Sequence, residues 1–174
     1  MLKYLFIVLI SCINILLNAS NMTTVDNVDL MKYQGTWYEI AKIPNWFQKK
    51  CAKNVTATYK LREDGYLSVF NRCVEKSGDV NDIEGLARVK DTLTNAKLEV
   101  SFVKFLWNNW FWGDYWIIGL ADDYSWVVVG TPEKKYGWIL AREKQLNKTT
   151  QRHIFEILEE KGYDPRNFVF TLQE

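Results

Sequence analysis

The sequence predicts an all-β domain, a sandwich or a barrel, because short strand-like segments follow one another with turn residues between most of them. Residues 55–61 alternate apolar and polar side chains, Arg62 to Gly65 form a turn, and residues 66–72 return as the second strand of a hairpin. One amphipathic helix interrupts the strands, late in the sequence. The remaining strands are expected at residues 35–41, 82–89, 97–103, 115–120, 125–130 and 137–142.

The helix is expected to begin after Asn147, a suitable N-cap, and to stop at Gly162. Its apolar stripe consists of Ile154, Phe155, Ile157 and Leu158. A last short strand at residues 167–171 follows Pro165. We find no linker, repeat or low-complexity segment, so one domain is expected over residues 25–174.

Charge and composition exclude several classes of protein. The 174 residues contain 22 Lys and Arg against 21 Asp and Glu, so no general electrostatic attraction to nucleic acid is expected. Charged residues make up 25% of the sequence, which excludes a disordered tail or a polytopic membrane protein. The single histidine, His153, rules out a catalytic or metal-binding histidine cluster. With no glycine-rich phosphate loop and no metal-ligand spacing, the sequence gives no support to an enzyme.

The N-terminal residues 1–19 predict a secretory signal, with a short basic start, an apolar run and a small residue, Ala19, at the cleavage position. A second interpretation stays open, because residues 9–12 resemble a bacterial lipobox in which Cys12 becomes the lipidated first residue. The third interpretation is that the N-terminal apolar segment is not removed and serves as an anchor. Each alternative exports the chain to the periplasm or cell envelope, and acylation of Cys12 would tether it to the outer membrane.

Export places Cys51 and Cys73 in a compartment that permits disulfides. If Leu61 pairs with Tyr66 in the hairpin, position 73 lies opposite position 54, close to Cys51. A modest bend then joins the two sulfurs and closes a loop of 22 residues. The alternative is a pair of free buried thiols.

The sequence resembles the lipocalin family in motifs that occur in order over residues 29–170. The segment from Gly35 to Ala41, Gly-Thr-Trp-Tyr-Glu-Ile-Ala, resembles the first lipocalin motif, Gly-x-Trp on the first strand. Residues 138–142, Trp-Ile-Leu-Ala-Arg, resemble the third motif, in which an arginine ends the eighth strand. Residues 54–72 and 84–85, between these two motifs, also resemble the corresponding segments in the branch that contains the bacterial outer-membrane lipocalins and apolipoprotein D. The second motif departs from the pattern, with Ala121 where an aspartate is expected.

The resemblance implies an eight-stranded antiparallel up-and-down β-barrel that encloses a cup and is closed at one end. One C-terminal α-helix and a short final strand complete the expected fold. Gly35, Trp37 and Arg142 are then a structural floor, with the Arg142 guanidinium stacked on the Trp37 indole. The implied alternation along the strands points the expected ligand-binding side chains into the cup: Glu39, Ala41, Val55, Ala57, Tyr59, Val69, Asn71, Ile83, Ala87, Val100, Phe102, Tyr115, Ile117, Val127, Val129, Tyr136, Trp138 and Leu140.

The expected partner is a fatty acid, a lysophospholipid or a similar amphiphile, bound for storage or transport in the cell envelope with a role in membrane maintenance. The mostly apolar lining of the cup favours such a ligand, and no metal or cofactor is expected. A lipocalin-fold enzyme and a pigment or haem carrier are the alternatives, as is a barrel filled entirely by its own side chains. Buried Glu39 either faces the polar end of a ligand or is satisfied within the protein by Tyr59, Asn71 or water.

Aromatic side chains concentrate in two segments that the resemblance places at the open end of the barrel. Residues 102–116 contain eight of them, and the first loop, residues 44–50, adds two beside two lysines. Because tryptophan and lysine favour a membrane interface, the following residues are expected to form a rim that contacts membrane: Trp46, Phe47, Trp107, Trp110, Phe111 and Trp112. Alternatively these rings pack on one another or roof the barrel. The protein is expected to be a monomer or a weak homodimer.

Overall fold

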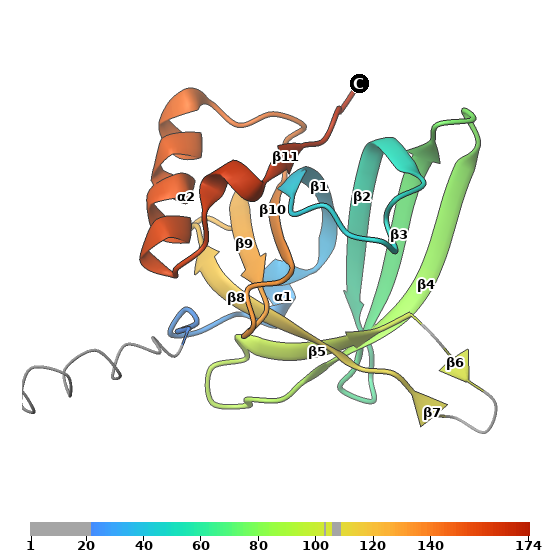
Figure 1. The fold of residues 1–174 in the computed structure, drawn as a ribbon. Helices are drawn as coiled ribbons and strands as arrows, with labels where there is room; N and C mark the ends of the chain where they lie inside the picture. The colour runs from blue at the N-terminus through green and yellow to red at the C-terminus, as the bar shows by residue number, and fades with distance from the viewer. Residues whose placement is uncertain (1–21, 103, 106–108) are drawn as a thin grey trace, which may run out of the picture.

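The computed structural model describes residues 22–102, 104–105 and 109–174, and its main feature is a closed β-barrel (Figure 1). Each neighbouring pair in the order β10-β9-β8-β5-β4-β3-β2-β1 is hydrogen-bonded, and β10 also pairs with β1, which closes the ring. All of these pairings are antiparallel, so the predicted eight-stranded up-and-down barrel is confirmed. The barrel strands are β1 (Gly35–Lys42), β2 (Cys51–Leu61), β3 (Leu67–Glu75), β4 (Val80–Val89), β5 (Lys97–Ser101), β8 (Gly113–Leu120), β9 (Trp126–Gly130) and β10 (Gly137–Ala141). The expected signal segment and Cys12 lie outside the described residues.

The hairpin of β2 and β3 has a different register from the predicted one. Leu61 pairs with Leu67, not with Tyr66, because the carboxylate of Asp64 accepts from the Tyr66 amide and keeps that residue in the turn. Two irregularities in β2 then shift the pairing in the opposite direction, so that Lys53 lies opposite Val74 and Cys51 opposite Glu75. The predicted disulfide between Cys51 and Cys73 is nevertheless confirmed, with its Cα atoms 5.6 Å apart.

Apolar side chains form two cores, one inside the barrel and one between its outer surface and the helix α2 (Lys148–Glu160) (Figure 1). The side chain of Asn147 caps the helix by accepting from the Thr150 amide, as predicted. Ile154 and Leu158 on the predicted stripe are fully buried against the barrel. The chain leaves the helix through Gly162, whose φ of 78° is a conformation that glycine adopts without strain. Among the described residues, none of the helices combines the length and the apolar character that crossing a bilayer requires.

Ala41 belongs to the outer core, so the prediction that it points into the cup is wrong. The reason is a bulge in β1. Glu39 pairs with Leu140 and Ala41 with Ile139, so one extra residue of β1 stands against β10. An extra residue reverses the alternation of side chains beyond it, which directs Ala41 outward.

Four short elements were not predicted from the sequence. The helix α1 (Leu30–Tyr33) is capped by the Asp29 carboxylate, which accepts from the Met31 amide. The strands β6 (Lys104–Phe105) and β7 (Asn109–Trp110) form a separate hairpin that projects from the barrel away from α2 (Figure 1). A 3-10 helix, η2 (Pro165–Asn167), follows α2 and leads into the final strand.

The final strand, β11 (Val169–Phe170), pairs with the outer half of β1. The direct pairing of β1 with β2 covers only residues 35–38 of β1, so the two strands separate toward the open end. The segment 169–174 bridges this seam. The Thr171 amide donates to the Ile40 carbonyl on one side at 2.9 Å, and the Asn54 amide donates to the Leu172 carbonyl on the other at 2.8 Å. These residues therefore complete the wall of the barrel.

Candidate functional site

The closed end of the barrel is held together by Arg142. Its guanidinium carbon lies 3.7 Å from the centre of a Trp37 ring that is fully buried, which is the stacking that the resemblance implies. The guanidinium also donates to four backbone carbonyls, those of Lys32, Tyr33, Gln34 and Thr36. Burial lowers the pKa of Arg142 below its usual range.

Gly35 is required beside this stack. Its φ is 95°, and a Cβ atom there would lie 3.3 Å from Nη1 of Arg142. Gly35, Trp37 and Arg142 thus act together as one structural unit at the closed end.

Above this floor, three tyrosine hydroxyls meet in the centre of the barrel. Tyr59 on β2 donates to the Tyr115 hydroxyl at 2.9 Å, and the Tyr33 hydroxyl lies 2.7 Å from the same oxygen. All three side chains are buried. Burial raises the pKa of Tyr59 to about 12 and raises the pKa values of Tyr33 and Tyr115 well above their usual range. We call these three residues the tyrosine cluster.

Most of the predicted lining residues take part in the inner core. Those buried there are Tyr59, Val69, Ala87, Tyr115, Ile117, Val127, Val129 and Leu140. Those packed against this core and partly buried are Ala57, Val100, Phe102 and Trp138. The described part of the inner wall is therefore mainly apolar, as expected for an amphiphile site.

Other predicted lining residues lie nearer the open end. Val55 is buried, and Asn71 pairs across the sheet with Ala57 on one side and Ile83 on the other. The Asn71 Oδ1 atom is buried and has no hydrogen-bond partner among the described residues. Ile83 is 45% exposed and not enclosed. Among the described residues, β5 pairs with β4 only from Leu86 onward, so the outer part of β4 is paired with β3 on one edge and lacks a strand on the other.

Glu39 is buried and bound within the protein, by partners other than the predicted Tyr59 and Asn71. Its carboxylate accepts from Lys42 Nζ at 2.5 Å, from Gln48 Nε2 at 2.8 Å and from the Thr171 hydroxyl at 2.6 Å. These partners come from β1, the first loop and the C-terminal segment. Glu39 therefore ties three parts of the open end together.

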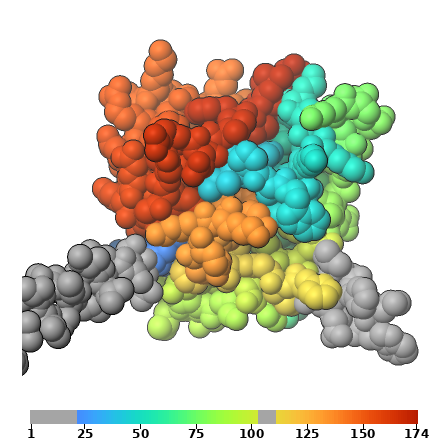
Figure 2. Space-filling model, viewed as in Figure 1, coloured from blue at the N-terminus to red at the C-terminus, as the bar shows by residue number. Residues whose placement is uncertain are grey.

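The first loop folds against the open end of the barrel. Phe47 packs on Tyr136 and Trp138, with ring centres 5.4 and 6.4 Å apart. Gln48 accepts from the Trp138 indole at 3.0 Å. Trp46 is 78% exposed. Figure 2 shows the red C-terminal segment lying against the cyan part of the chain.

The predicted rim is divided between two places. The ring of Trp112 lies on the outer face of the barrel, 4.2 Å from the Arg88 guanidinium carbon and 6.3 Å from the Tyr66 ring. Tyr66 follows the turn at the closed end, so the prediction that Trp112 belongs to the open rim is wrong. The cause is the short pairing between β5 and β8, which ends at Val100 and Gly113 and lets the chain leave the wall early. Phe111 is exposed, Trp110 is part of β7, and Trp107 lies outside the described residues.

Several important residues were missed in the sequence. Tyr33 belongs to the four-residue helix α1, which is too short for a periodicity signal. Gln48 is nine residues from Glu39 and reaches it through the fold of the first loop, whereas Thr171 is 132 residues away, and no strand or helix periodicity marks either pair. Asp29, an N-cap before an apolar residue, was the one local signal available for α1.

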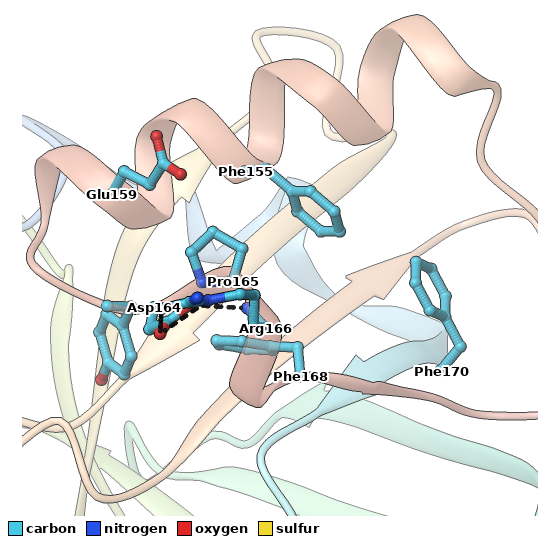
Figure 3. A pocket seen from close by; sticks show the side chains of 8 residues that line it. Phe155, Glu159, Asp164, Pro165, Arg166, Phe168 and Phe170 are labelled. Carbon is cyan, nitrogen blue, oxygen red and sulfur yellow. Dashed lines mark hydrogen bonds and ion pairs between the residues drawn. The ribbon is translucent and has the colours of Figure 1, made fainter.

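A shallow groove of about 680 Å³ lies outside the barrel, between α2 and the segment that contains η2 (Figure 3). Phe155, Phe168 and Phe170 line it, and Arg166 on its edge is bound to Asp164. In the part of the chain that the structure describes, no three acidic, cysteine or histidine side chains come together as metal ligands would.

Comparison with known proteins agrees with this geometry. Residues 28–173 match the family model described as a lipocalin-like domain. Temperature-induced lipocalin-1 of Arabidopsis thaliana is 37% identical over 146 residues, which cover 82% of this chain and 78% of that protein. Outer membrane lipoprotein Blc of Escherichia coli K12 is 35% identical over 153 residues, 87% of this chain and 83% of the relative. Apolipoprotein D of Macaca fascicularis is 37% identical over 155 residues, which cover 86% of this chain and 79% of that protein.

Among solved structures, insecticyanin from the tobacco hornworm Manduca sexta superposes with a TM-score of 0.69. The superposition covers 86% of this chain and 83% of the insecticyanin chain. The sequence identity is 23%, so this likeness supports the fold alone. The closed eight-stranded barrel, the Trp37–Arg142 stack and the sequence matches lead to one conclusion: the chain belongs to the lipocalin family.

Proposed function

We propose that this protein binds and carries a small hydrophobic or amphiphilic molecule, such as a fatty acid or a lysophospholipid, inside the barrel. The observation that carries the proposal is the mainly apolar inner wall above a floor closed by the Trp37–Arg142 stack. Apolar burial recognises chains of this kind without a charge on the protein. We infer a binding role and not a catalytic one, because membership of the lipocalin family favours it.

The proposal is tested by filling the cup. Ala57 borders the inner core from β2, whereas Ala52 on the same strand is exposed. Ala57→Phe should weaken binding of a fluorescent fatty acid at least tenfold, and Ala52→Phe should leave it unchanged. Native mass spectrometry of the purified wild-type protein should detect a retained lipid. Failure of the wild type to bind fatty acids and lysophospholipids in both measurements would refute the proposal.

We further propose that the tip of the first loop touches a membrane surface. Trp46 and Phe47 are 78% and 49% exposed and precede two exposed lysines, Lys49 and Lys50. Aromatic rings favour the membrane interface and lysines favour anionic head groups. Trp46→Ser with Phe47→Ser should reduce co-flotation with anionic vesicles several-fold. The matched control replaces exposed Leu93, in the turn between β4 and β5 at the closed end, with Ser.

We propose that the protein acts in the cell envelope. Some of the relatives are named outer membrane lipoproteins, and Cys12 at the end of the lipobox-like segment would provide the anchor. Labelling of expressing bacterial cells with a palmitate analogue distinguishes the alternatives. Label on the wild type that is lost in Cys12→Ser supports an acylated protein, and equal absence of label in both supports ordinary cleavage or a retained anchor.

A further inference from the structure

The tyrosine cluster spans the barrel from wall to wall. In the closed ring of eight strands, β2 and β8 are separated by three strands in either direction, so Tyr59 and Tyr115 start from opposite walls. Their hydroxyls nevertheless meet at 2.9 Å. The ring of Tyr33 in turn packs on Trp37, with centres 5.1 Å apart. A ligand that descends into the cup therefore reaches these hydroxyls before it reaches the Trp37–Arg142 stack.

The hydrogen bonds within the cluster leave one donor over. Three hydroxyls carry three hydrogens, but only two oxygen–oxygen contacts join them. Because Tyr59 donates to Tyr115, the surplus hydrogen belongs to Tyr33 or Tyr115. It has no acceptor among the described residues. A buried donor without a partner costs free energy, which an acceptor brought by a ligand would offset.

The surroundings favour an uncharged acceptor. The core around the three hydroxyls consists of apolar side chains such as Val69, Ile117 and Leu140. Arg142 is the cation whose charge acts on Tyr33, and its guanidinium is stacked on Trp37 and held by backbone carbonyls. A carboxylate placed at the cluster would lose its hydration without gaining a cation.

We propose that the tyrosine cluster is a hydrogen-bonding site at the bottom of the cup for a neutral oxygen acceptor, a ketone, ester or alcohol oxygen, on the buried end of the ligand. This inference rests on the proposed function, because it requires that a ligand enters the barrel. It specifies the ligand class further: an apolar chain with an oxygen at the end that enters first.

The test compares 2-dodecanone with dodecane, which share an apolar chain and differ in one carbonyl. The variant Tyr33→Phe, Tyr59→Phe, Tyr115→Phe keeps the rings and removes all three hydroxyls together, so that no hydroxyl of the cluster is left unpaired. It should bind 2-dodecanone about 3- to 10-fold more weakly than wild type, the effect of one net hydrogen bond, and bind dodecane within about twofold of wild type. Tyr66→Phe, on the outer face, is the matched control and should change neither affinity.

Two outcomes separate this inference from the proposed function. If the triple variant binds both probes as the wild type does, the tyrosine site is refuted and the carrier function stands. If the wild type binds the fluorescent fatty acid but neither of these probes, the tyrosine site alone is refuted. If it binds none of the three, both proposals fail. A second readout needs only the wild type: the infrared carbonyl stretch of bound 2-dodecanone should lie at the lower frequency of a hydrogen-bonded ketone. A stretch at the value found in an alkane solvent would overturn the inference even if the triple variant did not fold.

Discussion

The hydroxyl of Tyr59 donates to that of Tyr115 at 2.9 Å, although the two residues stand on opposite walls of the barrel. This contact lies above the Trp37–Arg142 stack that the family resemblance identifies as the floor. It also joins strands that no sheet pairing connects. The stability of the barrel should therefore respond to the ionisation of these tyrosines.

The protein should lose stability at alkaline pH. Burial raises the pKa of Tyr59 to about 12, above the value of about 10 expected in the unfolded chain. Below pH 10 both states hold the proton and the contribution is complete. As the pH rises from about 10 to about 12, the unfolded chain ionises first and the folded state loses its advantage. Denaturant unfolding followed by circular dichroism should show this loss. Equal alkaline sensitivity of the triple Phe variant would contradict the explanation.

Replacing Arg142 should destabilise the closed end. Arg142→Met removes the cation from the Trp37 ring and the guanidinium hydrogen bonds to four backbone carbonyls, which should lower the free energy of unfolding by about 2–4 kcal/mol. Urea unfolding monitored by tryptophan fluorescence measures the change. Arg166→Met is the control, since Arg166 is exposed and its side chain binds Asp164. A similar loss in both variants would argue against a special role for the stack.

Removing the disulfide should reduce stability by about 3 kcal/mol, the value expected for a closed loop of 22 residues. The double substitution Cys51→Ser, Cys73→Ser tests this by guanidinium unfolding. A reducing agent should lower the midpoint of the wild type to that of the double variant. It should leave the double variant itself unaffected, and a further shift there would indicate another cause.

Glu39→Gln should affect stability and leave ligand affinity unchanged. The substitution removes the negative charge that pairs with Lys42 inside the protein, which should cost about 1–3 kcal/mol. Fatty-acid affinity should remain within about twofold of wild type, because the Glu39 carboxylate is occupied by Lys42, Gln48 and Thr171. Exposed Glu63→Gln serves as the control for stability. A large drop in affinity without a loss of stability would instead place Glu39 at the ligand.

Local sequence patterns correctly predicted the strands and the helix, because the alternation of side chains and the capping residues that form them are close together in the sequence. Alternation located all eight barrel strands to within a few residues, and Asn147 and Gly162 marked the ends of α2. Features that depend on one extra residue were not visible. A single bulge turned Ala41 outward, and a longer turn moved Leu61 by one position in its pairing. Sequence periodicity carries no information about either event.

The lining residues were predicted correctly where the family pattern fixes the alternation of side chains along a strand. The prediction failed where the first loop and the C-terminal segment meet the barrel. Val127, Val129 and Leu140 lie in the inner core as expected. The partners of Glu39 were predicted wrongly, because the first loop and the C-terminal segment bring Gln48 and Thr171 to it. Packing of distant segments is decided by the whole fold, so it can be read only from the structure.

The seam between β1 and β2 has a consequence for the order in which the protein can assemble. Residues 169–174, which fill the seam, emerge from the ribosome more than a hundred residues after β2 (Cys51–Leu61). Successive strand pairs from β1 to β10 can form during synthesis, but the seam stays split until translation reaches these residues. The ring of strands can therefore close once β10 has been made, whereas the outer part of the seam between β1 and β2 is filled only after residues 169–174 have been made.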